Sequence, residues 1–300
     1  MKKKTYLIAL MAMALTLGSC SDNENGIGGE TSKYITVSTS IGNMTRVATD
    51  ANGGQTFEEG DEISVYAWIG ASTVAPETRE RVVNNAINKL TNGSWVATPQ
   101  MLWKNNRDKH YFIGVYPTAA ISDLSAGEYT FDANKQTESD LLVAVNPDGL
   151  SYSADAQQTV PLTFTHVMAK LAVNLTYKNQ WGGIPTVEKV VVGNAAKEAT
   201  INYLTKVVTP STTAKEDFSL PEITENTKYV SVIIPQEEVT QLTIVIGGKN
   251  FVYDNGTPFK LESGKITTVN LEVGRDEIKL GDVKITDWED GSTFGGEALN

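Results

Sequence analysis

Cysteine and histidine are scarce in this sequence, with one cysteine and two histidines among 300 residues. A single cysteine excludes an internal disulfide, a multi-cysteine zinc site and a redox CxxC pair. His110 and His166 each lie in or beside an apolar run, so we expect structural roles for both. The G-x-S-x-G, H-E-x-x-H and P-loop patterns are missing too, which leaves hydrolase, metalloprotease and nucleotide-binding functions without their minimal parts. We therefore expect no enzyme activity, no metal and no cofactor.

Positive charge is also scarce. The chain carries 25 Lys plus Arg against 36 Asp plus Glu, a net charge of −11, and its one basic run is Lys2 to Lys4. Because nucleic-acid binding depends on neutralising phosphates, no nucleic-acid partner is expected. The acidic stretch from Asp50 to Glu62 resembles a calcium loop only in part, since Gln55 stands where the EF-hand needs glycine. We interpret residues 58–62 as a solvated turn before a strand.

The N-terminal apolar run, Tyr6 to Leu17, has 12 residues and is too short to span about 30 Å of hydrocarbon. Together with Lys2 to Lys4 it predicts a signal peptide over residues 1–19. The run ends in Leu17-Gly18-Ser19-Cys20, which resembles the lipobox of bacterial lipoproteins. That resemblance implies cleavage before Cys20, acylation of its thiol and an outer-membrane lipid anchor at the cell surface. Residues 20–33, polar and glycine-rich, are predicted to be a flexible tether.

From Tyr34 onward the hydropathy period is two, the period of half-buried strands. Ile35, Val37, Thr39 and Ile41 alternate with polar residues in the first such segment. Further strands are predicted over 63–69, 111–116, 141–145, 167–177, 187–192, 229–234, 242–246, 249–253 and 266–273. Residues 82–90 also fit helical spacing, but asparagines there and Asn92-Gly93 after them favour a strand and hairpin. Gly247-Gly248 predicts a second tight hairpin.

Many short strands separated by turn signals predict an all-β chain built of β-sandwiches. The length suggests about two domains, at roughly 150 residues each. The sequence turns polar between Ser151 and Thr159, so we place an N-terminal sandwich at 34–158 and a C-terminal sandwich at 159–300. The five tryptophans are scattered along the chain, which favours packing roles over a glycan-binding face.

Several local patterns, taken in their shared order, resemble the fimbrillin family, the Mfa-like pilin subunits of type V pili. Besides the lipobox, the patterns are Thr45-Arg46, Phe57 to Tyr66, Tyr111 to Pro117, Asp140 to Ala144, Phe164 to Leu171, Leu261 to Lys265 and Ile285 to Trp288. The resemblance covers most of the chain after the tether. It implies two transthyretin-like β-sandwiches and a pilus (fimbrium) subunit that serves cell adhesion.

The resemblance also implies how such a subunit matures. A trypsin-like protease cuts near the N-terminus, the first strand leaves, and a strand from another pilus subunit takes its place. Arg46 is the predicted cleavage site, because it follows the strand that carries Ile35, Val37, Thr39 and Ile41. A cut at Lys33 would leave that strand attached, and an ordinary surface role for Arg46 is the alternative.

The donor segment is less apparent in the sequence. The residues after Trp288 contain few apolar side chains, so we place a candidate donor strand near 277–288, with Ile278, Leu280, Val283 and Ile285 as its apolar residues. Gly281-Asp282 interrupts the alternation and predicts a bulge or turn. Shaft, tip and anchor roles all remain open. A second function class also remains, a monomeric surface lipoprotein that binds glycan or a host ligand and exposes clustered tryptophans.

Overall fold

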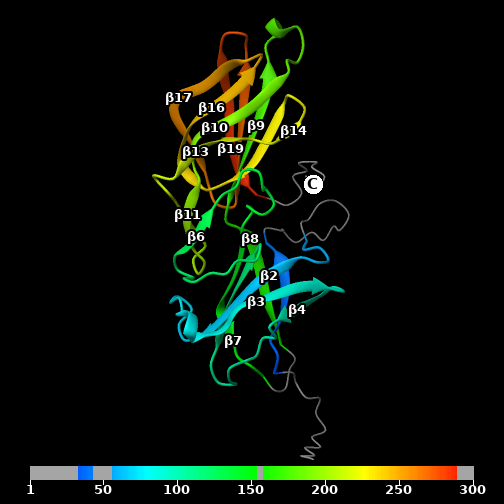
Figure 1. Ribbon diagram of the computed structural model, residues 1–300, viewed down its shortest axis with the longest axis vertical. Coiled ribbons are helices and arrows are strands. Elements are labelled where there is room, and N and C mark those ends of the chain that lie inside the picture. The colour runs from blue at the N-terminus through cyan, green and yellow to red at the C-terminus, as the bar shows by residue number, and fades with distance from the viewer. Residues whose placement is uncertain (1–32, 43–55, 154–157, 289–300) are drawn as a thin grey trace, which may run out of the picture. The chain divides into compact units, whose positions relative to one another are not determined.

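The computed structural model describes residues 33–42, 56–153 and 158–288 (Figure 1). Within them the chain is all-β, with nineteen strands and two single-turn 3₁₀ helices, η1 (Thr78–Glu80) and η2 (Asn179–Trp181). The described residues belong to one compact unit. The predicted all-β fold class is confirmed.

A seven-stranded sheet is formed by the first part of the chain. Its order is β1 (Thr36–Ile41), β8 (Thr159–His166), β7 (Leu142–Leu150), β5 (His110–Tyr116), β2 (Glu62–Ile69), β3 (Arg81–Thr91) and β4 (Ser94–Thr98). The segment that also fits helical spacing is strand β3, and Asn92-Gly93 turns it into β4, as predicted. Asn92 and Gly93 both have positive φ, which such a two-residue turn requires.

Three further sheets follow. A five-stranded sheet has the order β14 (Glu222–Thr224), β15 (Lys228–Ile233), β9 (Ala169–Tyr177), β18 (Lys265–Val273) and β19 (Ile278–Asp287). A four-stranded sheet has the order β13 (Lys215–Ser219), β10 (Val187–Ala196), β16 (Gln236–Ile246) and β17 (Lys249–Leu261). A three-stranded sheet has the order β12 (Val207–Pro210), β11 (Glu198–Asn202) and β6 (Gly127–Thr130).

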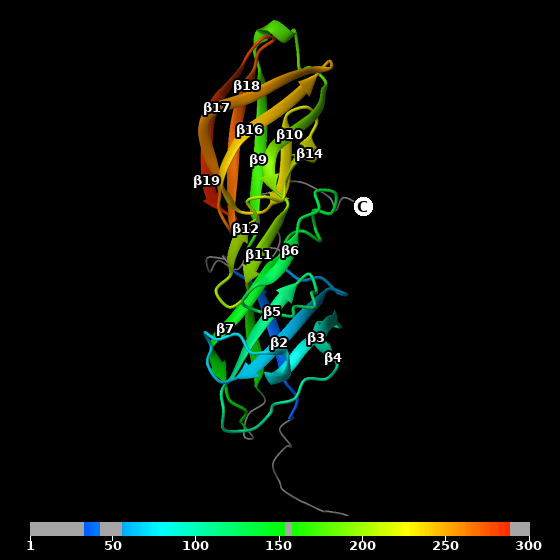
Figure 2. The same ribbon diagram turned by 60° about the vertical axis from the view of Figure 1, so that its left-hand side comes forward.

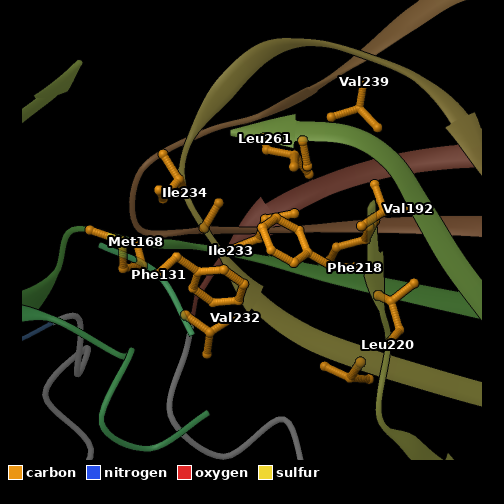
Figure 3. Close-up of a cluster of buried hydrophobic side chains, with 14 of the residues drawn as sticks. Phe131, Met168, Val192, Phe218, Leu220, Val232, Ile233, Ile234, Val239 and Leu261 are labelled. Atoms are coloured by element: carbon orange, nitrogen blue, oxygen red, sulfur yellow. The ribbon is translucent and has the colours of Figure 1, made fainter. Parts of the chain in front are cut away.

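The five-stranded and four-stranded sheets share one hydrophobic core, as the two layers of a sandwich do. Leu171 and Val269 come from one sheet, and Val190 and Ile244 from the other. Figure 3 shows a part of this cluster where the Phe131 and Phe218 rings meet edge to face, with centroids 4.9 Å apart. Gly247-Gly248 forms the predicted hairpin between β16 and β17.

The central strands β2 and β5 are buried on both faces of the seven-stranded sheet, whereas the sequence predicts half-buried strands. Strands β1 and β3 alternate between more and less buried side chains, as predicted. In β2, Val65 and Ala67 join a core shared with β1 and β8, while Tyr66 and Trp68 join the larger cluster. The second face is covered by the loop after β5, whose Ile121 N–H donates to the Tyr66 hydroxyl over 2.9 Å. The loop also covers Ser64, whose hydroxyl accepts the Ala119 N–H over 2.9 Å, so both faces of β2 are packed and six of its successive residues are buried.

The predicted division at 158/159 stays a prediction. The strand that opens the predicted second domain, β8, pairs with β1 and β7 in the seven-stranded sheet. The chain enters the five-stranded sheet only at Ala169. The polar stretch before Thr159 therefore precedes the last strand of the seven-stranded sheet, and the change of sheet falls at Val167 and Met168.

Candidate functional site

The predicted site residues fall in two edge strands and in two segments that the structure does not describe. Cys20 and Arg46 lie outside the described residues, so lipid attachment and cleavage remain predictions. The first-strand residues Ile35, Val37, Thr39 and Ile41 lie in β1 or directly before it. The candidate donor residues lie in β19. These two strands are the edges of different sheets.

Strand β1 supplies apolar side chains to the core, although it is an edge strand and pairs with only one other strand, β8, in the described sheet. Ile35, Val37 and Ile41 are only 3%, 6% and 8% exposed, and Thr39 is half-buried. All six residues of β1 pair in parallel with β8, from Thr36 opposite Thr159 to Ile41 opposite Phe164. The alternate side chains face solvent, where the Ser40 hydroxyl donates to the Thr163 hydroxyl over 3.2 Å.

The other edge of β1 borders a groove of about 620 Å³. Just N-terminal to β1, Ile35 N–H donates to Met101 O over 2.9 Å, and Trp103 N–H donates to Lys33 O over 3.2 Å. Further along, Trp95 reaches across from β4, and its Nε1–H donates to the Thr39 hydroxyl over 3.0 Å. No charged side chain lines the groove among the described residues.

The backbone of β1 is exposed to this groove. Backbone groups of successive strand residues point to opposite edges. Gly42 N–H donates to Phe164 O on the β8 side, while Ile35 N–H points the other way, to Met101 O. The N–H and C=O groups of Val37, Thr39 and Ile41 therefore point toward the groove. Within the described residues, no strand of the sheet pairs with β1 there.

Phe57 packs in an aromatic cluster beside the groove. Its ring makes edge-to-face contacts with Trp95, Tyr116 and Phe164, at centroid distances of 5.3, 5.4 and 5.1 Å. Burial, and then the nearby Asp61 carboxylate, raise the pKa of Tyr116 above its ordinary value. Asp61 also accepts the Glu58 N–H over 2.7 Å, which closes the predicted acidic turn before β2.

Strand β19 pairs antiparallel with β18 at the edge of the five-stranded sheet (Figure 2). The pairing shifts register between Asn270 and Leu271, which face Asp282 and Leu280, so Gly281 is the extra residue of a bulge, as predicted. Ile278, Leu280 and Val283 are partly buried against the core. Ile285 is 41% exposed. An apolar stripe of this kind holds the strand only along its inner face.

A cluster of four side chains, which we call the Trp288 clamp, lies at the end of β19. It consists of Asp140, His166, Lys170 and Trp288. The Trp288 indole is 3% exposed and stacks on the His166 imidazole, with centroids 3.9 Å apart and planes 6° from parallel. His166 Nδ1 lies 2.8 Å from Asp140 Oδ1. Lys170 Nζ lies over the indole, 4.0 Å from the ring centroid.

His110 is held by two backbone groups. Lys104 N–H donates to Nε2 over 3.1 Å. On the other side of the ring, Nδ1–H can donate to the Asp108 carbonyl, which lies 3.1 Å from Nδ1. Burial is the main cause that lowers the pKa of His110 below its ordinary value. These contacts are those of a structural histidine, as predicted. His166, stacked on Trp288, is likewise enclosed in packing.

None of the five tryptophans is exposed, which confirms the predicted packing roles. Trp68 and Trp288 are buried, and Trp95, Trp103 and Trp181 are half-buried. Among the described residues no group of three or more His, Cys, Asp or Glu side chains could hold a metal ion. The described part of the chain also contains no helix with the length and apolar character needed to cross a membrane.

Two features of the site were not predicted. Strand β8 carries Val160, Leu162, Phe164 and His166 with a period of two, a signal that Pro161 obscured. The clamp was missed as well, although its side chains come from three of the sequence patterns named above. Nothing in the sequence indicates that those patterns meet, because they lie far apart along the chain.

Comparison with known proteins places these features in a family context. A family model described as fimbrillin-like matches residues 45–288. No curated protein shows significant similarity to the sequence. Among solved structures, a putative cell adhesion protein from Bacteroides uniformis has a TM-score of 0.63 and 18% identity, covering 86% of this chain and 100% of its own.

Two more solved structures have a similar fold. A putative cell adhesion protein from Bacteroides ovatus has a TM-score of 0.64 and 18% identity, over 85% of this chain and 98% of its own. A fimbrial protein from Bacteroides vulgatus has a TM-score of 0.53 and 13% identity, over 86% of this chain and 100% of its own. At these identities the structures show that the fold is shared.

Proposed function

Because this chain belongs to the fimbrillin-like family, we propose that it is a structural subunit of a cell-surface pilus that serves adhesion. The precursor is acylated at Cys20 and held in the outer membrane by that lipid. A trypsin-like protease cuts after Arg46, strand β1 leaves, and a strand from another pilus subunit takes its place.

The observation that carries this proposal is the position of β1. It is an edge strand, yet it covers part of a core through Ile35, Val37 and Ile41. Burying one such side chain is worth about 1.5–3 kcal/mol. Loss of β1 therefore uncovers apolar surface that a replacement strand can cover again.

Strand β8 makes the loss of β1 more consequential. Its pairing with β7 involves only Phe164, Thr165 and His166. The preceding residues, from Thr159 to Thr163, pair with β1 alone in the described sheet. Without β1, both edges of that segment lack a strand partner, and its backbone groups can be satisfied by an incoming strand.

We take β19 as the candidate donor, because it is an edge strand with an apolar inner face and a bulge that interrupts its pairing with β18. The alternative function, a monomeric lipoprotein that binds glycan, predicts clustered exposed tryptophans. The tryptophans are packed instead, so the pilus subunit is the better supported function.

A disulfide between β1 and β8 tests the proposal. The Ser40 and Thr163 hydroxyls are 3.2 Å apart, so an S40C/T163C variant places two thiols face to face. Both this variant and the parent chain lack residues 1–19 and carry C20S, so the only thiols are the engineered pair. After limited trypsin digestion the parent should lose the peptide ending at Arg46 and form a ladder of oligomers on a native gel.

The oxidised S40C/T163C variant should be cut at the same bond, retain the peptide by intact mass and stay monomeric, and reduction should restore the oligomers. The single S40C variant is the matched control and should behave as the parent. Oligomers from the oxidised variant, or a cut parent that stays monomeric, would rule out strand exchange at β1.

A further inference from the structure

Trp288 is the most deeply buried side chain at the C-terminal end of the described chain. None of the ten residues of β19 is buried, while Trp288, one position beyond the strand, is 3% exposed. Its backbone continues the pairing, because Trp288 N–H donates to Gly264 O over 3.0 Å. The edge strand therefore ends in one well-buried anchor.

The anchor holds β19 to residues of two sheets. His166 ends β8 of the seven-stranded sheet, and Lys170 lies in β9 of the five-stranded sheet. A ring stacked at 3.9 Å leaves no room on that face of the indole for an ammonium 4.0 Å from the centroid. The imidazole and the ammonium thus cover opposite faces, which favours both stacking and cation–π attraction.

The base of the anchor is tightly packed. The turn between β17 and β18 lies directly against the chain that follows His166, since Ser263 Oγ donates to Val167 O and Gly264 N–H donates to Met168 O, both over 2.8 Å. Gly264 has a φ of +67°, and a Cβ there would lie 3.1 Å from His166 O. The indole therefore binds a surface that has little room to shift.

We propose that the Trp288 clamp is a latch that retains β19 in its own subunit. With the indole held by His166 and Lys170, the strand stays paired with β18. Withdrawal of the indole leaves the last residues of β19 with backbone pairing, the partly exposed Ile285 and the solvent-accessible Lys265–Asp287 ion pair, so that end frays first. The latch itself does not depend on the proposed function. Only its purpose does, because release of β19 would make the strand available to a neighbouring subunit.

Hydrogen exchange of the monomeric chain, without residues 1–19 and before any protease, tests the latch. In W288A, those amides of residues 283–287 that point toward β18 should exchange at least about tenfold faster than in the parent. In W288F, which keeps a ring to stack on His166, the increase should be smaller.

The matched control is W181A. Trp181 is half-buried at the other end of β18, where its Nε1–H donates to Val273 O over 2.9 Å. This variant should leave exchange at 283–287 unchanged. Parent-like exchange in W288A, or an equal increase in W181A, would overturn the latch.

Assembly of the same variants after trypsin digestion separates the two proposals. Faster exchange in W288A with faster oligomer formation supports both the latch and β19 as donor. Faster exchange without any change in assembly supports the latch and overturns the donor role of β19. Unchanged exchange with normal oligomers overturns the latch and leaves strand exchange at β1 standing.

Discussion

At the scale of single residues, His110 shows how a buried histidine limits stability. Lys104 N–H donates to Nε2, so that nitrogen must stay unprotonated for the bond to exist. The Trp103 ring meets the imidazole edge to face with centroids 5.0 Å apart. The neutral imidazole is therefore part of the folded structure, and protonation removes an acceptor as well as adding a buried charge.

We predict that acid weakens the fold through His110. Its folded pKa is lowered by burial, so its contribution is complete above the unfolded value of about 6.5 and is lost as pH falls through the lowered folded value. Urea unfolding at pH 7.5 and 5.5 should show a larger loss of unfolding free energy for the parent than for H110Q. His166 is present in both chains, so its effect on the unfolding free energy cancels in the comparison. Equal losses would contradict the prediction.

At the scale of elements, the hairpin between β3 and β4 depends on a backbone conformation and on a charge. Asn92 and Gly93 have φ values of 52° and 72°. Glu59 accepts the Asn92 N–H over 2.6 Å, which ties the acidic turn before β2 to this hairpin. The hairpin in turn positions Trp95 across the groove from β1.

Gly93→Ala should destabilise the chain by about 1 kcal/mol, because residues with a Cβ rarely adopt positive φ. There is open space around the added Cβ, so the loss comes from backbone strain alone. Asn92→Gly, the neighbouring control, should change the free energy of unfolding by only a few tenths of a kcal/mol. Urea titration measures both, and an unchanged midpoint for Gly93→Ala would refute the strain argument.

At the scale of the whole described chain, the sheets are connected by the segment between β6 and β7. Phe131 contacts Phe218 of the four-stranded sheet, and Gln136 binds β15 of the five-stranded sheet beyond the residues that pair with β14. The Gln136 side-chain oxygen accepts the Val232 N–H over 2.7 Å, and its Nε2–H donates to the Ser231 hydroxyl over 3.1 Å. This amide takes the place of a neighbouring strand at Val232.

Gln136→Ala should lower the free energy of unfolding by about 1–3 kcal/mol, because it leaves a partly buried N–H without its acceptor. Lys135→Ala on the same loop is the control and should lower the free energy of unfolding by much less than Gln136→Ala, since the Lys135–Glu138 pair is exposed. Denaturant titration with fluorescence compares the two. Equal losses would mean that the loop as a whole, and not the amide, is responsible.

The sequence by itself determined the local features of this protein. Alternation predicted β1, β2 and β18, Asn92-Gly93 and Gly247-Gly248 predicted hairpins, and Gly281 predicted a bulge. Each of these depends on side-chain periodicity or on a preferred backbone angle, which neighbouring residues define. The ordered motifs also predicted the family, which the match over residues 45–288 confirmed.

Only the tertiary structure decided which strands meet and how many faces they bury. The parallel pairing of β1 with β8 and the cover over Tyr66 and Trp68 depend on contacts between distant segments. The clamp joins Asp140 to Trp288 in the same way. Such contacts depend on the packing of the whole core. A hydropathy period of two predicts which side chains share a face of a strand, but it does not predict which segment covers that face.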